Sequence, residues 1–316
     1  MAAAGLLLLV MTGTATGADD EQSREEKPFS ERIKRVELTG DGEVWMSFGG
    51  RLRERVEVWD DFAFGNGGNA QTSDTFLLSR ALVHADTHVG DHTRVFIQGK
   101  SSLSTDRELP GGERALDVDD LDLQQGFLEL NTAGDNATSP NFRLRAGRQE
   151  LSLGAQRLVS PLDWSNTRRT FEGFSGIAEV GGWDITGFWT RFVPVRQHDF
   201  NRAVDETELW GLYGAGQAPF ADTVDLYWLG TSQDAQSING TSGREERQTL
   251  GARLKDNIGT TDFDYEVESA YQFGEVGDSD VNASMFAGEL GYEFVDTALS
   301  PRPYVGFDYA SGDDSP

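Results

Sequence analysis

Strict alternation of apolar and polar residues recurs along almost the whole chain and constrains its fold more than any other feature. In TDFDYEVESAYQF at 261–273, Phe263, Tyr265 and Val267 fall on one face, and acidic residues fall on the other. A period of two is typical of a β-strand whose two faces meet different surroundings. The pattern predicts thirteen strands, at 43–59, 75–89, 93–102, 121–130, 141–153, 171–180, 183–193, 208–217, 223–230, 247–254, 261–273, 283–294 and 303–310.

The predicted connections alternate between a longer and a shorter set. The longer set is 60–74, 103–120, 154–170, 194–207, 231–246 and 274–282, and the shorter set is 90–92, 131–140, 181–182, 218–222, 255–260 and 295–302. Antiparallel hairpins with long external loops and short periplasmic turns are typical of an outer-membrane β-barrel. A soluble β-sandwich is the alternative. Charged residues on the second face of the strands disfavour it, because a water-filled lumen accepts them and a sandwich core does not.

Composition excludes several other classes of protein. The 316 residues include 27 Lys and Arg against 53 Asp and Glu, so the net charge is −26, and cysteine is absent. Such a charge argues against nucleic-acid binding, and the lack of cysteine excludes disulfides and thiolate metal sites. No stretch after residue 20 holds the ~18 consecutive apolar residues of a membrane helix. We therefore expect outer-membrane lipid as the surroundings and no nucleic-acid partner.

The N-terminus predicts export from the cytoplasm. The apolar run GLLLLVM at 5–11 is too short to span a bilayer, and the small residues that follow it fit a signal peptide over 1–18. A buried N-terminal segment is the alternative. Residues 19–42 carry charges of both signs and are expected to form a flexible periplasmic lead-in. The barrel domain is expected over 43–316.

Positive charge is concentrated in two segments of this acidic chain. Segment 141–170 holds six arginines against Glu150 and Asp163, and segment 44–55 holds three arginines against Glu54. A narrow passage lined with one sign of charge attracts ions of the opposite sign, and arginine binds carboxylates through two parallel hydrogen bonds. An arginine-lined path for a polyanion or an organic acid is one interpretation. The other, compatible with it, is that the arginines brace the barrel by pairing with acids such as Asp86, Glu129, Asp264 and Glu268.

The stretch GRQELSLGAQRLVSPLDWSNTRRTFEG at 147–173 resembles the signature of the alginate-export family of outer-membrane barrels. GGRLRER at 49–55 and QQGFLEL at 124–130 resemble early strands of that family, and the resemblance covers most of 43–316. It implies an anion-selective barrel that passes an acidic polysaccharide through a constriction lined with arginines. It also implies eighteen strands in the complete fold, so that the thirteen predicted here would belong to a C-terminally truncated barrel. The residues that it carries over are Arg148, Arg157, Asp163, Trp164, Arg168 and Arg169.

The expected path adds arginines of two strands to these motif residues. Arg143 and Arg145 alternate with apolar neighbours, and an arginine that faces lipid at the bilayer midplane costs ~2–4 kcal/mol, so both are predicted to face the lumen. Arg51 and Arg53 are placed there by the same alternation. The DWSN sequence that begins at Asp163 reads as a turn that folds its loop inward, with Asp163 pinning Arg168 or Arg169.

No catalytic, cofactor or metal site is predicted. His84 and His88 would lie on one face of a strand about 13 Å apart, at ~3.3 Å per residue, which is too far for one metal ion. The acidic run DVDDLDL at 117–123 is expected to be a solvated loop.

The sequence thus predicts an all-β protein, an antiparallel up-and-down transmembrane β-barrel in the outer membrane of a Gram-negative cell. Its expected function is passage of anionic saccharide, a polyuronate or its oligomers, with periplasmic secretion or uptake components as candidate partners. A general or organic-acid porin is one alternative, and a barrel hydrolase or lyase acting on acidic polysaccharide is another. Because thirteen strands cannot close such a barrel, strands 43–59 and 303–310 are expected to lie unpaired along one edge.

Overall fold

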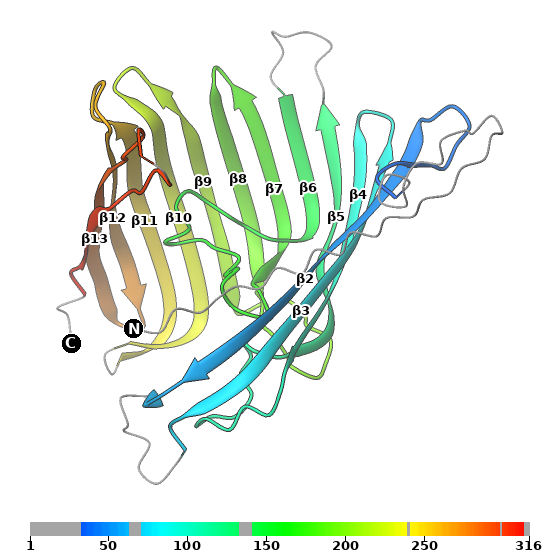
Figure 1. Ribbon diagram of the computed structural model, residues 1–316, viewed down its shortest axis with the longest axis horizontal. Coiled ribbons are helices and arrows are strands. Elements are labelled where there is room, and N and C mark those ends of the chain that lie inside the picture. Colours follow the sequence, from blue (N-terminus) through cyan, green and yellow to red (C-terminus); the bar gives the residue numbers. More distant parts are fainter. Residues whose placement is uncertain (1–32, 63–70, 133–140, 239–240, 298, 313–316) are drawn as a thin grey trace.

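The computed structural model describes residues 33–62, 71–132, 141–238, 241–297 and 299–312, so the predicted signal peptide lies outside the described residues. These residues form one antiparallel sheet in which every strand pairs with its neighbours in the chain. Figure 1 shows this sheet curving into an open barrel wall. Its strands are β1 (Val36–Glu37), β2 (Val44–Trp59), β3 (Asp74–Val89), β4 (Thr93–Ser104), β5 (Asp119–Thr132), β6 (Asn141–Gln149), β7 (Thr170–Val180), β8 (Trp183–Val193), β9 (Thr207–Ala218), β10 (Ala221–Ile238), β11 (Thr241–Asn257), β12 (Phe263–Val276), β13 (Ser279–Tyr292) and β14 (Tyr304–Ala310).

All thirteen predicted strands are present in the predicted order, as β2 to β14, and one strand was missed. The extra strand β1 lies within 19–42, so the described part of the predicted lead-in is not structureless. Val36 pairs with Met46, and the guanidinium of Arg35 lies 4.8 Å from the centre of the Trp45 ring. Two pairing residues are too few to give a period-two pattern, which is why the alternation did not reveal them.

Two of the six long connections were predicted wrongly. Segment 231–246 lies mostly in β10 and β11, which run as one long hairpin, and segment 274–282 lies mostly in β12 and β13, which meet at a tight turn. Gly277 has a φ of +56°, which the turn requires and which glycine adopts without strain. Segment 231–246 contains few apolar residues, so hydropathy did not show that its backbone continues the ladder. One predicted short connection was also wrong, because β13 and β14 are joined by segment 293–303, which is longer than the predicted segment 295–302.

The two faces of the sheet differ in the way that a membrane barrel requires. Large apolar side chains stand exposed on the convex face, among them Leu52 at 71%, Val56 at 65% and Phe174 at 63% exposure. The opposite face carries buried polar and charged side chains, such as Arg80, Lys100 and Glu268. An apolar outward band and a polar interior match a transmembrane β-barrel, in which lipid meets the first face and the lumen meets the second.

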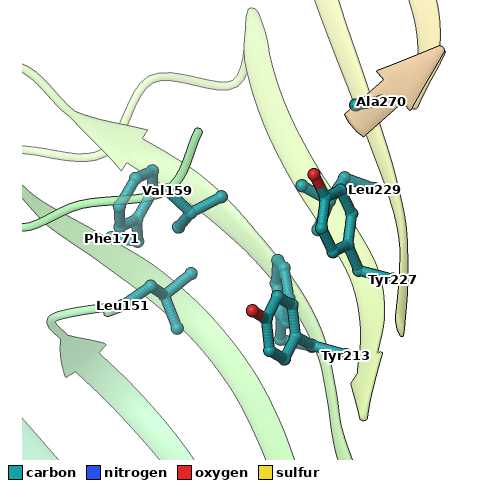
Figure 2. Close-up of a cluster of buried hydrophobic side chains, with 8 residues drawn as sticks. Leu151, Val159, Phe171, Tyr213, Tyr227, Leu229 and Ala270 are labelled. Atoms are coloured by element: carbon teal, nitrogen blue, oxygen red, sulfur yellow. The ribbon is translucent and has the colours of Figure 1, made fainter. Parts of the chain in front are cut away.

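The hydrophobic core lies on the inner face of the sheet. Figure 2 shows Leu151 and Val159, from the connection between β6 and β7, packed toward Phe171 and toward Tyr213, Tyr227, Leu229 and Ala270 of the strands. Phe188 of β8 completes this cluster of buried side chains. The connection at 150–169 therefore buries apolar side chains inside the curve of the sheet and does not extend away from it.

The sheet is open among the described residues. No ladder joins β14 to β1 or β2 in this part of the chain, and all seven residues of β14 are exposed. The predicted free edge at 303–310 is thus confirmed. The edge of 43–59 is partly covered, because β1 pairs with its first residues. The number of strands in the complete barrel stays a prediction.

Candidate functional site: an inward-folded loop and its arginine cluster

The connection 150–169 between β6 and β7, here called the inner loop, lies within the curve of the sheet (Figure 1). Short backbone turns shape it: the amide of Ser165 donates to the oxygen of Leu162 over 3.0 Å, and that of Arg169 to the oxygen of Pro161 over 2.7 Å. Its main-chain groups bind side chains of distant strands. The inner loop is thus held by the wall of the barrel and not by its own secondary structure.

One side of the inner loop is bound by arginines of β2 and β3. Arg53 donates to the main-chain oxygens of Asp163 over 2.6 Å and Ser165 over 2.5 Å, and Arg55 donates to that of Trp164. Arg80, whose side chain is fully buried, donates to the Asp163 carboxylate over 2.8 Å and to the Ser165 oxygen over 3.0 Å. These bonds satisfy carbonyl groups that would otherwise lie inside the protein without donors.

Asn166 fastens the same side of the loop to three different segments. Its buried amide group donates to the main-chain oxygens of Ser79 over 3.0 Å, Leu103 over 3.2 Å and Asp117 over 2.8 Å. The oxygen of Asn166 itself accepts from Ser102 over 2.8 Å. One side chain therefore links β3, β4, the connection 105–118 and the inner loop.

The other side of the inner loop contacts strands far away in the sheet. Arg157 forms ion pairs with Glu266 over 2.8 Å and with Glu268 over 2.7 Å, both on β12. Glu268 also accepts from the Tyr227 hydroxyl over 2.8 Å. The inner loop therefore crosses the interior of the curved sheet from β2 and β3 to β12.

A cluster of charged groups surrounds Asp163, and we call it the arginine cluster; it consists of Arg51, Arg53, Arg80, Arg168, Asp163 and Glu150. Arg168 binds both Asp163 and Glu150, whereas Arg51 reaches Asp163 only at 3.4 Å and keeps 53% of its side chain exposed. Burial alone would raise the pKa of Asp163, but the charges of Arg168, Arg80 and Arg51 outweigh it and lower that pKa. Four guanidinium groups share two carboxylates, so the cluster carries net positive charge.

The predicted pairing of Asp163 with Arg168 is present, and a pairing with Arg169 is not. Trp164 keeps 60% of its side chain exposed beside the cluster. Arg169 lies over the ring of Phe192, with its guanidinium carbon 5.8 Å from the ring centre. Burial lowers the pKa of Arg169, and among the described residues no carboxylate offsets this effect.

Three other predicted arginines lie on the inner side of β6, and each is paired with a carboxylate. Arg143 binds Glu179 over 2.9 Å, and Arg145 binds Glu129 over 2.6 Å. Arg148 is buried and binds Asp122 over 2.9 Å and Glu172 over 2.6 Å. The bracing interpretation holds for two of the four acids named for it, because Glu129 pairs with Arg145 and Glu268 with Arg157. Asp86 and Asp264 pair instead with Arg94 and Arg302, which lie outside the two arginine-rich segments.

The acidic run at 117–123 is not the solvated loop that the sequence predicted. Asp117, Asp119 and Asp122 are buried, and Asp119 binds Lys100 over 2.7 Å while Asp117 binds Arg114 over 2.7 Å. Arg114 is local in sequence, but the partners of Asp119 and Asp122 are Lys100 and Arg148, so the run itself could not show that those charges would be compensated. Within the described ranges, no three His, Asp or Glu side chains are grouped to hold a metal ion.

Several residues of the site escaped the sequence analysis. Arg80, Lys100 and Asn166 were not among the predicted residues, although each is a buried polar group that binds the inner loop or its neighbours. Arg80 and Lys100 lie on the polar faces of their predicted strands. This pattern indicated where they would lie, but it did not indicate which groups they would bind.

Over the residues that the structure describes, no helix is long and apolar enough to cross a membrane.

The family model for alginate export matches residues 44–316, nearly the whole barrel domain. The chain belongs to the alginate-export family. No curated protein matches it. As a member of that family, with an open barrel sheet and an apolar outward face, the protein is a channel of the Gram-negative outer membrane.

Solved structures with a similar fold include two barrels of low sequence identity. OccK8 (OprE) of Pseudomonas aeruginosa is 11% identical, with a TM-score of 0.54 over 86% of this chain and 69% of that protein. OccAB1 of Acinetobacter baumannii is 13% identical, with a TM-score of 0.51 over 90% of this chain and 69% of that protein. At these identities the likeness concerns the fold alone.

Proposed function

We propose that this channel passes an anionic saccharide, a polyuronate or its oligomers, alongside the inner loop, and that it catalyses no reaction. Membership of the alginate-export family supports a polysaccharide as the solute. The arginine cluster supports its negative charge. Such a role implies periplasmic components that deliver the saccharide to the channel or receive it.

The observation that carries the proposal is the incomplete neutralisation of the arginine cluster. Arg53 donates to main-chain oxygens and to the Asn166 amide oxygen, so none of its hydrogen bonds ends on a carboxylate. Arg51 holds Asp163 loosely and keeps about half of its side chain free. A carboxylate that passes can therefore displace the weak contact of Arg51 and accept two parallel hydrogen bonds from its guanidinium.

A passage suits a polymer only if no single site holds a sugar carboxylate too tightly. Asp163 provides for this, because its carboxylate competes with the solute for the same guanidinium groups. Conduction through a channel requires binding that is favourable enough for entry and weak enough for exit. The partly neutralised cluster fits that requirement better than a set of free arginines would.

Block of the channel current by oligouronates tests the proposal. The protein purified from outer membranes is placed in a planar bilayer, and short oligomers of a uronic acid are added to one side. We expect brief, concentration-dependent interruptions of the current, and we expect Arg51→Gln to shorten them. Neutral oligosaccharides of the same length should interrupt the current far less.

Arg143→Gln is the matched control, because it removes the same charge from the inner face at a place away from the inner loop. Its effect on the interruptions should be the smaller one. If neutral and acidic oligomers block equally, or if Arg143→Gln acts as strongly as Arg51→Gln, the cluster is not the saccharide path. Shortening of the oligomers during the experiment would instead show that the barrel is a hydrolase or a lyase.

A further inference from the structure

A pocket of about 210 Å³ lies where the inner loop meets the connection 105–118 and the end of β8. It is smaller than the ~300–1,000 Å³ of sites for drug-sized ligands, so its size suits a ligand built on a single ring. Its walls are largely apolar and come from Leu116, Leu162, Phe192, Val193 and Val195. Leu116 keeps 37% of its side chain exposed, which leaves the rim open to solvent.

Arg169 lines this pocket and brings a positive charge without a partner into it. Its guanidinium makes no hydrogen bond or ion pair with the described part of the chain, and it lies over the Phe192 ring. Arg168, the next residue, is by contrast bound to two carboxylates. A half-buried cation without a counter-ion attracts an anion into the pocket, since pairing offsets the cost of its desolvation.

The rest of the pocket is poorly suited to a sugar ring. It offers only two hydroxyl groups, and each already makes one hydrogen bond: Ser165 accepts from the amide of Arg168 over 3.1 Å, and Thr167 donates to the oxygen of Ala115 over 2.8 Å. Most hydroxyls of a hexuronate that entered the pocket would therefore leave water without a replacement partner, which is costly. An apolar ring loses nothing in this way, and an aromatic ring can pack against Phe192.

We propose that this pocket binds a small apolar monocarboxylate, with the carboxylate on Arg169 and the hydrocarbon part against Phe192 and Leu116. The ligand class is separate from the saccharide that the channel is proposed to pass. Binding here would place a small organic acid beside the inner loop, next to the arginine cluster.

Equilibrium binding of benzoate to the purified full-length protein tests the proposal. Titration calorimetry should detect benzoate, and neither benzamide, which lacks the charge, nor galacturonate, which lacks the apolar ring, should bind comparably. Arg169→Gln should weaken benzoate binding about tenfold to a hundredfold, as expected for the loss of one charge-assisted, paired contact. Arg202→Gln, which changes an exposed arginine that does not line the pocket, should leave the affinity unchanged.

A second variant keeps the test decisive if Arg169→Gln fails to assemble. Leu116→Glu adds a carboxylate at the exposed rim, where it competes for Arg169, and it should weaken benzoate binding in the same direction. Equal binding of benzoate and benzamide, or unchanged affinity in both pocket variants, would overturn the proposal. Tighter binding of galacturonate than of benzoate would also overturn it and would assign the pocket to the saccharide.

Discussion

Arg80 of β3 and Asp163 of the inner loop are 83 positions apart in the chain, yet the Arg80 guanidinium donates to the Asp163 carboxylate over 2.8 Å. The same guanidinium also donates to the main-chain oxygen of Asp163 over 3.2 Å and to that of Ser165 over 3.0 Å. A fully buried cation of the wall therefore binds both the charge and the backbone of the loop. This contact decides how firmly the inner loop is held across the interior.

Replacement of Arg80 by alanine should loosen the inner loop while the barrel still assembles. The change removes the buried partner of the Asp163 carboxylate and one of the two donors to the Asp163 and Ser165 carbonyls, which Arg53 still binds, at a cost of about 1–3 kcal/mol for the loop-bound state. Trypsin cleavage after Arg168 or Arg169 should accelerate about five- to 150-fold if it follows the population of the open loop. Arg191→Ala removes the exposed ion pair with Asp205 and should change the cleavage rate little. Equal rates in the two variants would contradict the anchoring role of Arg80.

Asn166→Ala should destabilise the folded protein by about 1–3 kcal/mol, because its amide group no longer donates to three main-chain oxygens. The temperature at which the barrel loses its folded mobility on gels should fall accordingly. Asn257→Ala changes an exposed asparagine at the end of β11 and should leave that temperature within experimental error. A normal melting temperature for Asn166→Ala would mean that water replaces the amide without cost.

Gly154→Ala should displace the inner loop from the wall near β9. An added Cβ would lie 2.1 Å from the Tyr213 hydroxyl, which donates to Asp225 over 2.8 Å and cannot move away without breaking that bond. Gly259→Ala is the matched control, because its φ of +60° resembles the +53° of Gly154 while its surroundings are open. The loss in melting temperature should be larger for Gly154→Ala, and equal losses would show that only backbone strain matters.

Acidification should release the inner loop through protonation of Asp163. Its pKa lies below the ordinary value of 3.8 in the folded protein, so its charge stabilises the bound loop. That stabilisation is complete above pH 3.8 and is lost as the pH falls through the lowered value. The fluorescence of Trp164, obtained by subtraction of the Trp164→Phe spectrum, should change in this acidic range. Asp163→Asn should abolish the transition, and its persistence in that variant would assign it to another carboxyl group.

The strands could be predicted from the alternation of apolar and polar side chains. A strand of a barrel wall contacts lipid on one face and the lumen on the other, so its sequence alternates with a period of two residues. The alternation failed in 231–246, because this part of the β10 and β11 hairpin consists mostly of polar residues on both faces. It also failed for β1, which is too short to show a period.

The site was predictable only in part. The positive charge of 141–170 and the inward turn at Asp163 could be inferred from the sequence, and the pairing with Arg168 is local in sequence. The contacts of Arg80 and Asn166 depend on which strands the loop meets after the wall has curved. Long-range pairing of this kind leaves no pattern in a single sequence, so the division of arginines into braced and partly free ones became visible only in three dimensions.

Ion selectivity tests the central claim most directly, namely that partly neutralised arginines beside the inner loop make this channel prefer anions. The measurement is the reversal potential of the protein purified from outer membranes, in a planar bilayer that separates two concentrations of potassium chloride. The account predicts a preference for chloride that weakens in Arg51→Gln. A preference for potassium in the unmodified protein would contradict it.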